Sequence, residues 1–282
     1  MIEESAINNA ESLIQSGTKK LSSISNVPRL EAEVLLSFLL NINPIKFHTD
    51  DIGISPKVMN KFGSMIDSRF KGMPMAYLTG KKEFWSKDFL INQSVLVPRP
   101  ETELMVEKAI EIYKKKAPNI LDIGTGSGCI GISIALKKPN FKVYGSDFSK
   151  NALDVASINK TNLNAQNFFL INADWLSCFK NDSFDLILSN PPYISQNDLH
   201  LKDLTHEPKI ALASNESGYS DIKKITQQSS KILKRRGILM IEHGYNQEKV
   251  VKSIFKDNYF SDICTIEDYQ AHPRVTYGIL NK

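Results

Sequence analysis

The sequence contains few of the residues that mark disulfide-bonded or zinc-binding proteins. It has three cysteines among 282 residues, Cys129, Cys178 and Cys264, and none of them forms a Cys-x-x-Cys pair or a Cys/His cluster. Disulfide frameworks and structural zinc sites need several such residues at short, regular spacing. The sequence therefore indicates neither class and fits a reducing compartment.

Long apolar runs are also absent. No stretch of about 18 consecutive apolar residues occurs, and the N-terminus has no basic segment followed by an apolar one. These two features mark membrane-spanning helices and secretory signals. We therefore expect no membrane association and a cytoplasmic location. The five histidines are scattered, so we also expect no metal site.

The charged residues show no strong bias toward one sign. The formal net charge is +4, and the basic residues form only short runs, at 114–116 and 234–236. Because no long basic arm or stripe is present, the function does not require direct binding to nucleic acid. A content of 41% hydrophobic and 23% charged residues is typical of a globular protein. The length favours a large domain that carries a smaller one.

The first 75 residues have the pattern of a small helical domain. Residues 4–17 place apolar side chains at helical spacing, and Gly17 is the expected end of that helix. Pro28 is the expected start of a second helix. In the third, Ser55 is a plausible N-cap and Gly72 a plausible end.

The pattern changes after residue 75. Residues 83–98, EFWSKDFLINQSVLVP, are rich in aromatic and β-branched side chains, so residues 76–98 are predicted to form a linker with two short strands. From residue 99 to 282, strand-like and helix-like stretches alternate, which predicts an α/β fold with an open, doubly wound parallel sheet. The last two strand candidates are close together in sequence, and we expect them to be partly antiparallel.

A glycine-rich loop, LDIGTGSGCIG, separates a predicted strand from a predicted helix. It contains Gly124, Gly126, Gly128 and Gly131. Missing side chains let a ligand approach the backbone and the helix N-terminus, as in nucleotide sites. The loop matches the G-x-G-x-x-G pattern of dinucleotide-binding proteins, so a dinucleotide remains one candidate ligand. A phosphate-binding loop is rejected because the required Gly-Lys-Ser/Thr is absent.

Two polar segments follow the next predicted strands. Asp147 lies about 20 residues beyond the loop, where a carboxylate binds ribose hydroxyls in such folds; its alternative role is a helix cap. Asp174 and Trp175 follow the third strand, and the indole is suited to an adenine face. Trp175 is equally compatible with ordinary core packing.

The segment Asn190-Pro191-Pro192-Tyr193 ends the buried strand FDLILS. The prolines fix the backbone and have no N–H, so this turn presents acceptors, namely carbonyl groups and the Asn190 side-chain oxygen. Rigid acceptors suit an NH₂ group, and the tyrosine ring adds a face for a planar amide or base. A proline-rich turn is common in loops, but the position after a strand and beside the glycine loop favours a functional role.

Together these segments resemble the HemK/PrmC family, the release factor glutamine methyltransferases. The resemblance rests on PMAYLTGKKEFW, VLVPRPETE, LDIGTGSGCIG, NPPYI, HEPKIAL and RVTYG, in this order along nearly the whole chain. It implies a helical substrate-recognition domain (1–75), a β-hairpin linker (76–98) and a seven-stranded Rossmann-like methyltransferase domain (99–282). The implied reaction moves a methyl group from S-adenosyl-L-methionine to the glutamine nitrogen of the Gly-Gly-Gln motif in class 1 peptide chain release factors.

The resemblance also implies roles for individual residues. The implied donor-binding residues are Gly124, Thr125, Gly126, Ser127, Gly128, Asp147, Trp175 and Asn190. The implied glutamine-binding residues are Asn190, Pro191, Pro192 and Tyr193, of which Asn190 and Pro191 are catalytic. Arg99 and Glu101 either brace the substrate or form a structural ion pair. The chain departs from the family at residues 213–219, ASNESGY, where a glycine-rich turn with Asp-Gly is usual.

Four other functions remain open from the residues. A ribosomal-protein glutamine methyltransferase shares NPPY, but resembles PRSP where this chain has PRPE. A methyltransferase of exocyclic amines in nucleic acid also uses such turns, but would need a nucleic-acid domain. A dinucleotide-dependent oxidoreductase or a non-catalytic nucleotide-binding module explains the glycine loop but not NPPY.

Overall fold

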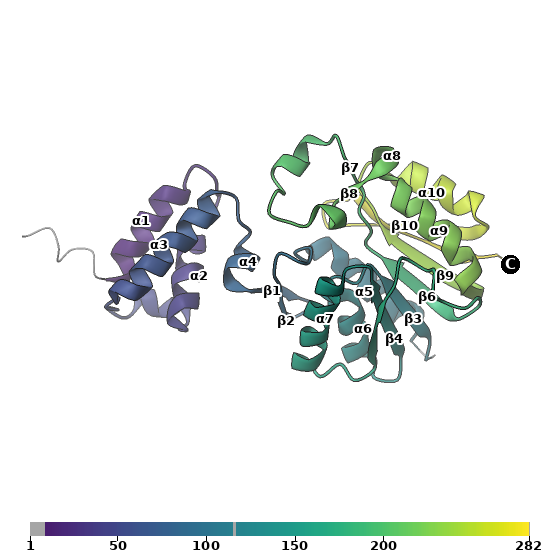
Figure 1. Cartoon of the computed structure of the whole chain (residues 1–282), viewed down its shortest axis with the longest axis horizontal. Coiled ribbons are helices and arrows are strands. Elements are labelled where there is room, and N and C mark those ends of the chain that lie inside the picture. The colour runs from purple at the N-terminus through teal and green to yellow at the C-terminus, as the bar shows by residue number, and fades with distance from the viewer. Residues whose placement is uncertain (1–8, 115–116, 282) are drawn as a thin grey trace, which may run out of the picture. The chain divides into compact units, whose positions relative to one another are not determined.

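The computed structural model describes residues 9–114 and 117–281, which divide into two compact units between Gly80 and Lys81 (Figure 1). The N-terminal unit is helical, and the β-hairpin belongs to the C-terminal unit. The helical unit extends a few residues past the expected boundary at 75, because a further short helix precedes Gly80.

The second and third helices of the helical unit begin where the sequence predicts, whereas the first begins at Ala10, after the extended N-cap Asn9. The elements of the unit are α1 (Ala10–Leu21), α2 (Pro28–Leu40), a 3₁₀ turn (Pro44–His48), α3 (Pro56–Phe70) and α4 (Met75–Thr79). The Ser55 side chain accepts a hydrogen bond from the Val58 amide at 3.4 Å, and a proline opens both α2 and α3. The beginning of the first predicted helix, residues 4–8, lies outside the described residues.

The prediction that Gly17 ends the first helix is wrong. Helix α1 continues to Leu21, and Gly17 lies buried inside it. A Cβ at this position would lie 3.0 Å from both Ile66 and Phe62, and 3.2 Å from Ala32. The glycine is therefore a site of close approach between α1 and its neighbours α2 and α3, which sequence alone does not distinguish from a helix end.

The C-terminal unit starts with a hairpin of β1 (Lys81–Phe84) and β2 (Lys87–Leu90), so the strands occupy only part of the predicted linker. Its turn residues Trp85 and Ser86 both have positive φ, as in a type I′ turn. The sequence analysis did not predict α5 (Glu103–Ile112). The remaining helices are α6 (Cys129–Lys137), α7 (Lys150–Asn162), α8 (Asn215–Gly218), α9 (Ser220–Ile232) and α10 (Glu248–Asp257).

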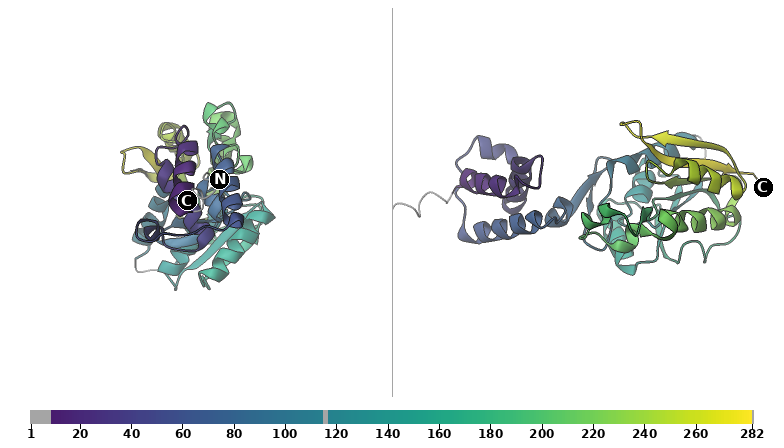
Figure 2. Two further views of the ribbon diagram at one scale, coloured as in Figure 1. Left: turned by 90° about the vertical axis from the view of Figure 1, so that its left-hand side faces the viewer. Right: turned by 90° about the horizontal axis from the view of Figure 1, so that it is seen from above.

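The central sheet has seven strands in the order β10-β11-β9-β6-β3-β4-β5. Its strands are β3 (Asn119–Ile123), β4 (Lys142–Asp147), β5 (Phe168–Asn172), β6 (Phe184–Ser189), β9 (Leu233–Glu242), β10 (Phe260–Glu267) and β11 (Pro273–Leu280). Five neighbouring strands are parallel, and β11 pairs antiparallel with both β9 and β10. The C-terminal hairpin, yellow in Figure 2, forms one edge of the sheet. The predicted doubly wound α/β fold with antiparallel final strands is confirmed.

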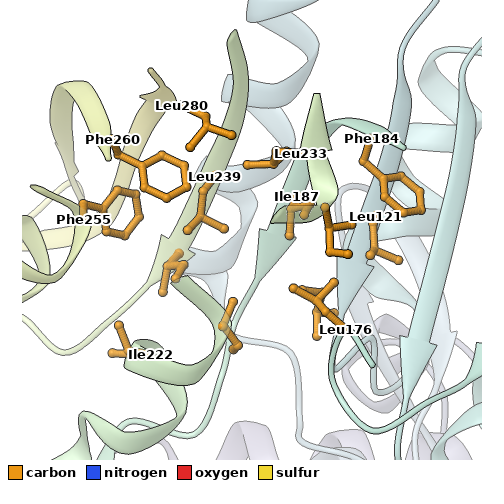
Figure 3. Close-up of a cluster of buried hydrophobic side chains, with 14 of the residues drawn as sticks. Leu121, Leu176, Phe184, Ile187, Ile222, Leu233, Leu239, Phe255, Phe260 and Leu280 are labelled. Atoms are coloured by element: carbon orange, nitrogen blue, oxygen red, sulfur yellow. The ribbon is translucent and has the colours of Figure 1, made fainter. Parts of the chain in front are cut away.

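Helices cover both faces of this sheet. Helices α9 and α10 pack together on one face, and α5, α6 and α7 form a separate group (Figure 1). Figure 3 shows the core beneath α9 and α10, where Ile222 and Phe255 face strand residues such as Leu239. Because side chains alternate along a strand, Leu121 and Ile123 of β3 enter this core while Asp122 between them does not.

The strand order creates a switch point between β3 and β6. The chain continues from β3 to β4 and β5 on one side and from β6 to β9 on the other. Ile123 pairs with Ser189, and the Ser189 hydroxyl donates to the Ile123 carbonyl at 3.0 Å. The next residues, Gly124 and Asn190, therefore leave adjacent strands at the same edge. Ligands of open α/β sheets bind at such an edge.

Candidate active site

A cavity of about 430 Å³ opens at the carboxyl ends of the parallel strands. Of the residues predicted to bind donor or substrate, nine line it: Gly124, Thr125, Gly126, Ser127, Asp147, Trp175, Asn190, Pro191 and Pro192. Gly128 and Tyr193 are not among its lining residues. The glycine loop and the NPPY turn, which are more than 60 residues apart in sequence, thus share one cavity.

The glycine loop takes a backbone path that favours glycine. Gly124, Gly126 and Gly128 have φ values of 67°, 55° and 81°, in the left-handed region. No side chain or backbone atom lies within 4 Å of a Cβ placed on Gly124, whereas one on Gly128 would lie 2.8 Å from Ile132. Gly124 therefore leaves the backbone open to a ligand, and Gly128 lets the start of α6 pack closely.

Two buried polar side chains hold this loop. The Asp122 carboxylate accepts the Thr125 hydroxyl at 2.6 Å and the Gly131 amide at 3.1 Å. Burial raises the pKa of Asp122 to about 6. On the other side, Asn159 of α7 donates to the Ser127 carbonyl at 2.9 Å and also pairs with the backbone of β2. The loop is thereby fixed before any ligand binds.

Asp147 ends β4 and faces the loop. One carboxylate oxygen accepts the Gly126 amide at 3.0 Å and the other accepts the Ser149 amide at 2.8 Å. The cap of α7 is instead Ser149, whose side chain accepts the Ala152 amide. Burial raises the pKa of Asp147. The carboxylate thus lines the cavity beside the glycine loop, and the helix does not need it as a cap.

Trp175 lines the same cavity from the segment after β5. Its backbone has φ 50°, and the Lys224 ammonium lies 6.0 Å from the ring centroid. The ring also packs against the core beneath α9 and α10. Trp175 therefore both lines the cavity and packs against the core. The exposed ring of Phe148, next to Asp147, lines the cavity as well. The two rings are suited to contact a flat base.

The NPPY turn presents its first three residues to the cavity. Asn190 Nδ2 donates to the Thr102 hydroxyl at 3.3 Å, and Thr102 also lines the cavity. Tyr193 turns elsewhere: its ring packs against the core, and its hydroxyl donates to Glu242 at 3.5 Å. Its carbonyl accepts Gln247 Nε2 at 3.1 Å. The tyrosine therefore anchors the turn.

The segments around the turn are tied together by ion pairing and tight packing. Arg99 forms an ion pair of 2.5 Å with the buried Glu207, whose other oxygen accepts the Val97 amide. This contact supports a structural ion-pair role for Arg99.

In the divergent loop 213–219, Glu216 and Ser217 have positive φ, followed by Gly218. A Cβ on Gly218 would lie 2.2 Å from the Tyr193 carbonyl, so this loop packs directly on the turn.

Sequence reasoning did not identify several residues of this site. The missed residues either lie apart from the motifs or lie within a motif without a signal of their own. They are Thr102, Asp122, Phe148 and Glu242. A buried aspartate within a strand, LDIG, was the one available signal, because a carboxyl group in such a place needs hydrogen-bond partners. The contacts of Thr102 and Glu242 depend on long-range folding and leave no local pattern.

Comparison with known proteins decides between the methyltransferase and dinucleotide interpretations. A family model described as "Methyltransferase domain" matches residues 114–273, and one described as "PrmC N-terminal domain" matches residues 12–80. A curated release factor glutamine methyltransferase from Buchnera aphidicola subsp. Acyrthosiphon pisum is 37% identical over 273 residues, which cover 96% of this chain and 98% of that protein. The chain belongs to the release factor glutamine methyltransferase family.

A second relative agrees with this family, and a solved structure agrees with the fold. A relative of the same name from Buchnera aphidicola subsp. Schizaphis graminum is 39% identical over 268 residues, covering 94% of this chain and 97% of that protein. A solved methyltransferase structure from Pyrococcus furiosus shares the fold, with a TM-score of 0.53, 17% identity and coverage of 69% of this chain and 89% of that one. The dinucleotide interpretation of the glycine loop is wrong.

The cavity fits S-adenosyl-L-methionine, the methyl donor of methyltransferases in this family. Gly124 and Gly126 offer an open backbone, Asp147 offers a carboxylate, and Trp175 and Phe148 offer flat apolar faces. These match an amino-acid chain, a ribose and an adenine. Within residues 9–114 and 117–281, no group of three or more metal-ligating side chains is arranged to hold an ion, and no helix is long and apolar enough to span a membrane.

Proposed function

We propose that the protein transfers a methyl group from S-adenosyl-L-methionine to the side-chain amide nitrogen of the glutamine in the Gly-Gly-Gln motif of class 1 release factors. One observation carries the proposal: the glycine loop and an acceptor-rich Asn-Pro-Pro turn line a single cavity at the switch point of the sheet. The family relationship supports the same reaction. We also propose a cytoplasmic location, where translation takes place.

The chemistry requires the enzyme to orient a weak nucleophile. An amide nitrogen reacts poorly because its lone pair is delocalised into the carbonyl group. Asn190 Oδ1 and the Pro191 carbonyl accept the two N–H groups of the substrate amide, which orients the nitrogen and stabilises the positive charge that develops on it. Pro191 and Pro192 have no N–H, so the turn presents no competing donor there. The product amide loses one proton after transfer.

The donor half of the cavity has a separate task. The backbone from Gly124 to Gly128 holds the methionine portion, Asp147 accepts hydrogen bonds from the ribose, and Trp175 contacts the adenine. When bound, the donor would supply an electrophilic methyl group on a sulfonium and would leave as the thioether S-adenosyl-L-homocysteine after the transfer. The rigid support of the loop by Asp122 and Asn159 keeps this half preorganised.

The test is mass spectrometry of a purified class 1 release factor after incubation with the protein and methyl-labelled S-adenosyl-L-methionine. We expect one added methyl group on the glutamine of the Gly-Gly-Gln motif. A release factor with that glutamine changed to alanine is the matched substrate control and is expected to gain none. Ribosomal proteins and nucleic acid are assayed in parallel.

The result discriminates among the candidate substrates. Label on the motif glutamine alone supports the proposal. Label on a ribosomal-protein glutamine or on nucleic acid, with an unmodified release factor, would keep the methyltransferase fold and overturn the proposed substrate.

A further inference from the structure

Asn190 is held by a hydroxyl group that lies outside the NPPY motif. Its Nδ2 donates to the hydroxyl of Thr102, a side chain that is only 2% exposed and precedes α5. Within the described residues, no hydrogen bond reaches Asn190 Oδ1, although the side chain lines the cavity. The amide is therefore anchored through its nitrogen end alone.

A buried carboxyl group lies beyond Thr102. Glu242, at the end of β9, is 2% exposed, and its charge interacts with Glu101 and Arg274. The nearby Thr102 side chain lowers the pKa of Glu242, but burial has the larger effect and raises it to about 7. The Tyr193 hydroxyl donates to Glu242 Oε1 at 3.5 Å. Glu242 thus contacts the residue that holds the start of the turn and the residue that ends it.

The direction of these hydrogen bonds follows from what each group can do. The NH₂ group of Asn190 only donates, so the Thr102 hydroxyl accepts from it through a lone pair. The single proton of that hydroxyl is then left to point toward Glu242. An asparagine held in this way keeps its oxygen for another donor, whereas a flipped amide would present its NH₂ group to the substrate NH₂ and repel it.

We propose that Thr102 and Glu242 are positioning residues that fix the orientation of the Asn190 amide, so that its oxygen is the end offered to the substrate. The inference rests on the proposed function, since it assigns the support of the same acceptor. Both residues act through Asn190, and Glu242 also acts through Tyr193. The buried carboxyl group of Glu242 fixes the direction of these hydrogen bonds, because it receives the proton of the Thr102 hydroxyl.

The test compares Thr102→Val with Thr102→Ser. Valine keeps the shape of threonine but removes the hydroxyl, while serine keeps the hydroxyl. Thr226→Val is the matched control, because Thr226 is also fully buried in this unit and its hydroxyl bonds to the Ile222 carbonyl within α9. Each variant is assayed for donor Kd and for the single-turnover rate of methyl transfer to a release factor.

We expect Thr102→Val to slow methyl transfer by roughly 10- to 100-fold, as misplacement of a positioned group does. Donor Kd should stay within about 2-fold, because the glycine loop, Asp147 and Trp175 are untouched. Thr102→Ser should recover most of the rate, and Thr226→Val should keep it. A wild-type rate in Thr102→Val, or an equal loss in Thr226→Val, would overturn the inference while leaving the proposed function in place.

A second measurement does not depend on the substrate. In protein labelled with ¹⁵N-asparagine, the Asn190 side-chain amide is assigned by the signal missing from Asn190→Ala. We expect two well-resolved protons that exchange slowly in the wild type, and averaged or rapidly exchanging protons in Thr102→Val and Glu242→Gln. Identical Asn190 signals in all three proteins would contradict the inference even if no methyl transfer to a release factor were found.

Discussion

Asp147 illustrates how one side chain serves both the fold and the proposed chemistry. Its two oxygens accept the Gly126 and Ser149 amides, which joins the glycine loop to the end of β4. The same carboxylate lines the cavity. The sequence predicted a choice between ribose binding and a helix cap, and the structure assigns the cap to Ser149. The ribose role remains a prediction.

We expect Asp147→Ala to weaken binding of S-adenosyl-L-methionine by roughly 10- to 100-fold, because hydrogen bonds to a charged group contribute about 1.5–3 kcal/mol. Asp147→Asn, which keeps an acceptor but loses the charge, should lie between the wild type and alanine. Isothermal titration calorimetry gives the Kd values. An unchanged Kd in Asp147→Ala would restrict this residue to a structural role.

Glu242 makes stability depend on pH. Burial raises the pKa of Glu242 from 4.5 to about 7 in the folded protein, so the folded state binds this proton more tightly than the unfolded state does. The stability that this tighter proton binding contributes is fully present below about pH 4.5, and it is lost as the pH rises through about 7. Removing the charge should therefore stabilise the protein at high pH.

The difference in free energy of unfolding between Glu242→Gln and the wild type should depend on pH. We expect it to favour Glu242→Gln more strongly at pH 8 than at pH 5, by on the order of 1–3 kcal/mol. Both tryptophans, Trp85 and Trp175, lie in the C-terminal unit, so their fluorescence during denaturation reports on the unit that contains Glu242. The buried Asp122 is present in both proteins and cancels in the comparison. The same pH dependence in both would contradict this assignment.

Among the secondary-structure elements, local patterns predicted the starts of α2 and α3 and the end of α3, but neither end of α1. Ser55, Pro28 and Pro56 mark helix starts because capping and proline geometry act within a few residues. Gly17 misled the prediction because its role depends on Phe62 and Ile66, almost 50 residues away. The missed helix α5 and the contacts of Asn159 likewise depend on tertiary packing. The glycine loop and the NPPY turn were predictable because each motif is continuous in sequence.

We expect Gly17→Val to destabilise the helical unit by roughly 1–3 kcal/mol, the usual cost of overpacking a close contact. Gly63→Val is the control: Gly63 is also inside a helix, α3, and nothing lies within 4 Å of a Cβ built there. The two changes share the same gain in helix propensity. Hydrogen exchange of the α1 amides measures the difference, and equal protection in both variants would show that Gly17 is not a packing site.

For the whole molecule, the order of the strands determines the position of the cavity more than any single motif does. Two segments far apart in sequence, after β3 and after β6, leave adjacent strands at the switch point and share one cavity. The seven-stranded fold followed from the alternation of elements and from the family resemblance. The supporting residues Thr102 and Glu242 did not, because they approach Asn190 only in the folded chain.

The measurement that tests this account most directly is methyl transfer by Asn190→Ala, compared with Asn258→Ala. Asn258 is a suitable control because its Nδ2 bonds to the Ile254 carbonyl within the α10 region. Single-turnover transfer to a release factor should fall by at least about 100-fold in Asn190→Ala, as when an oriented electrostatic contact is removed, while donor Kd stays within about 2-fold. Normal transfer by Asn190→Ala, or a loss explained entirely by weaker donor binding, would contradict the central role of the acceptor turn.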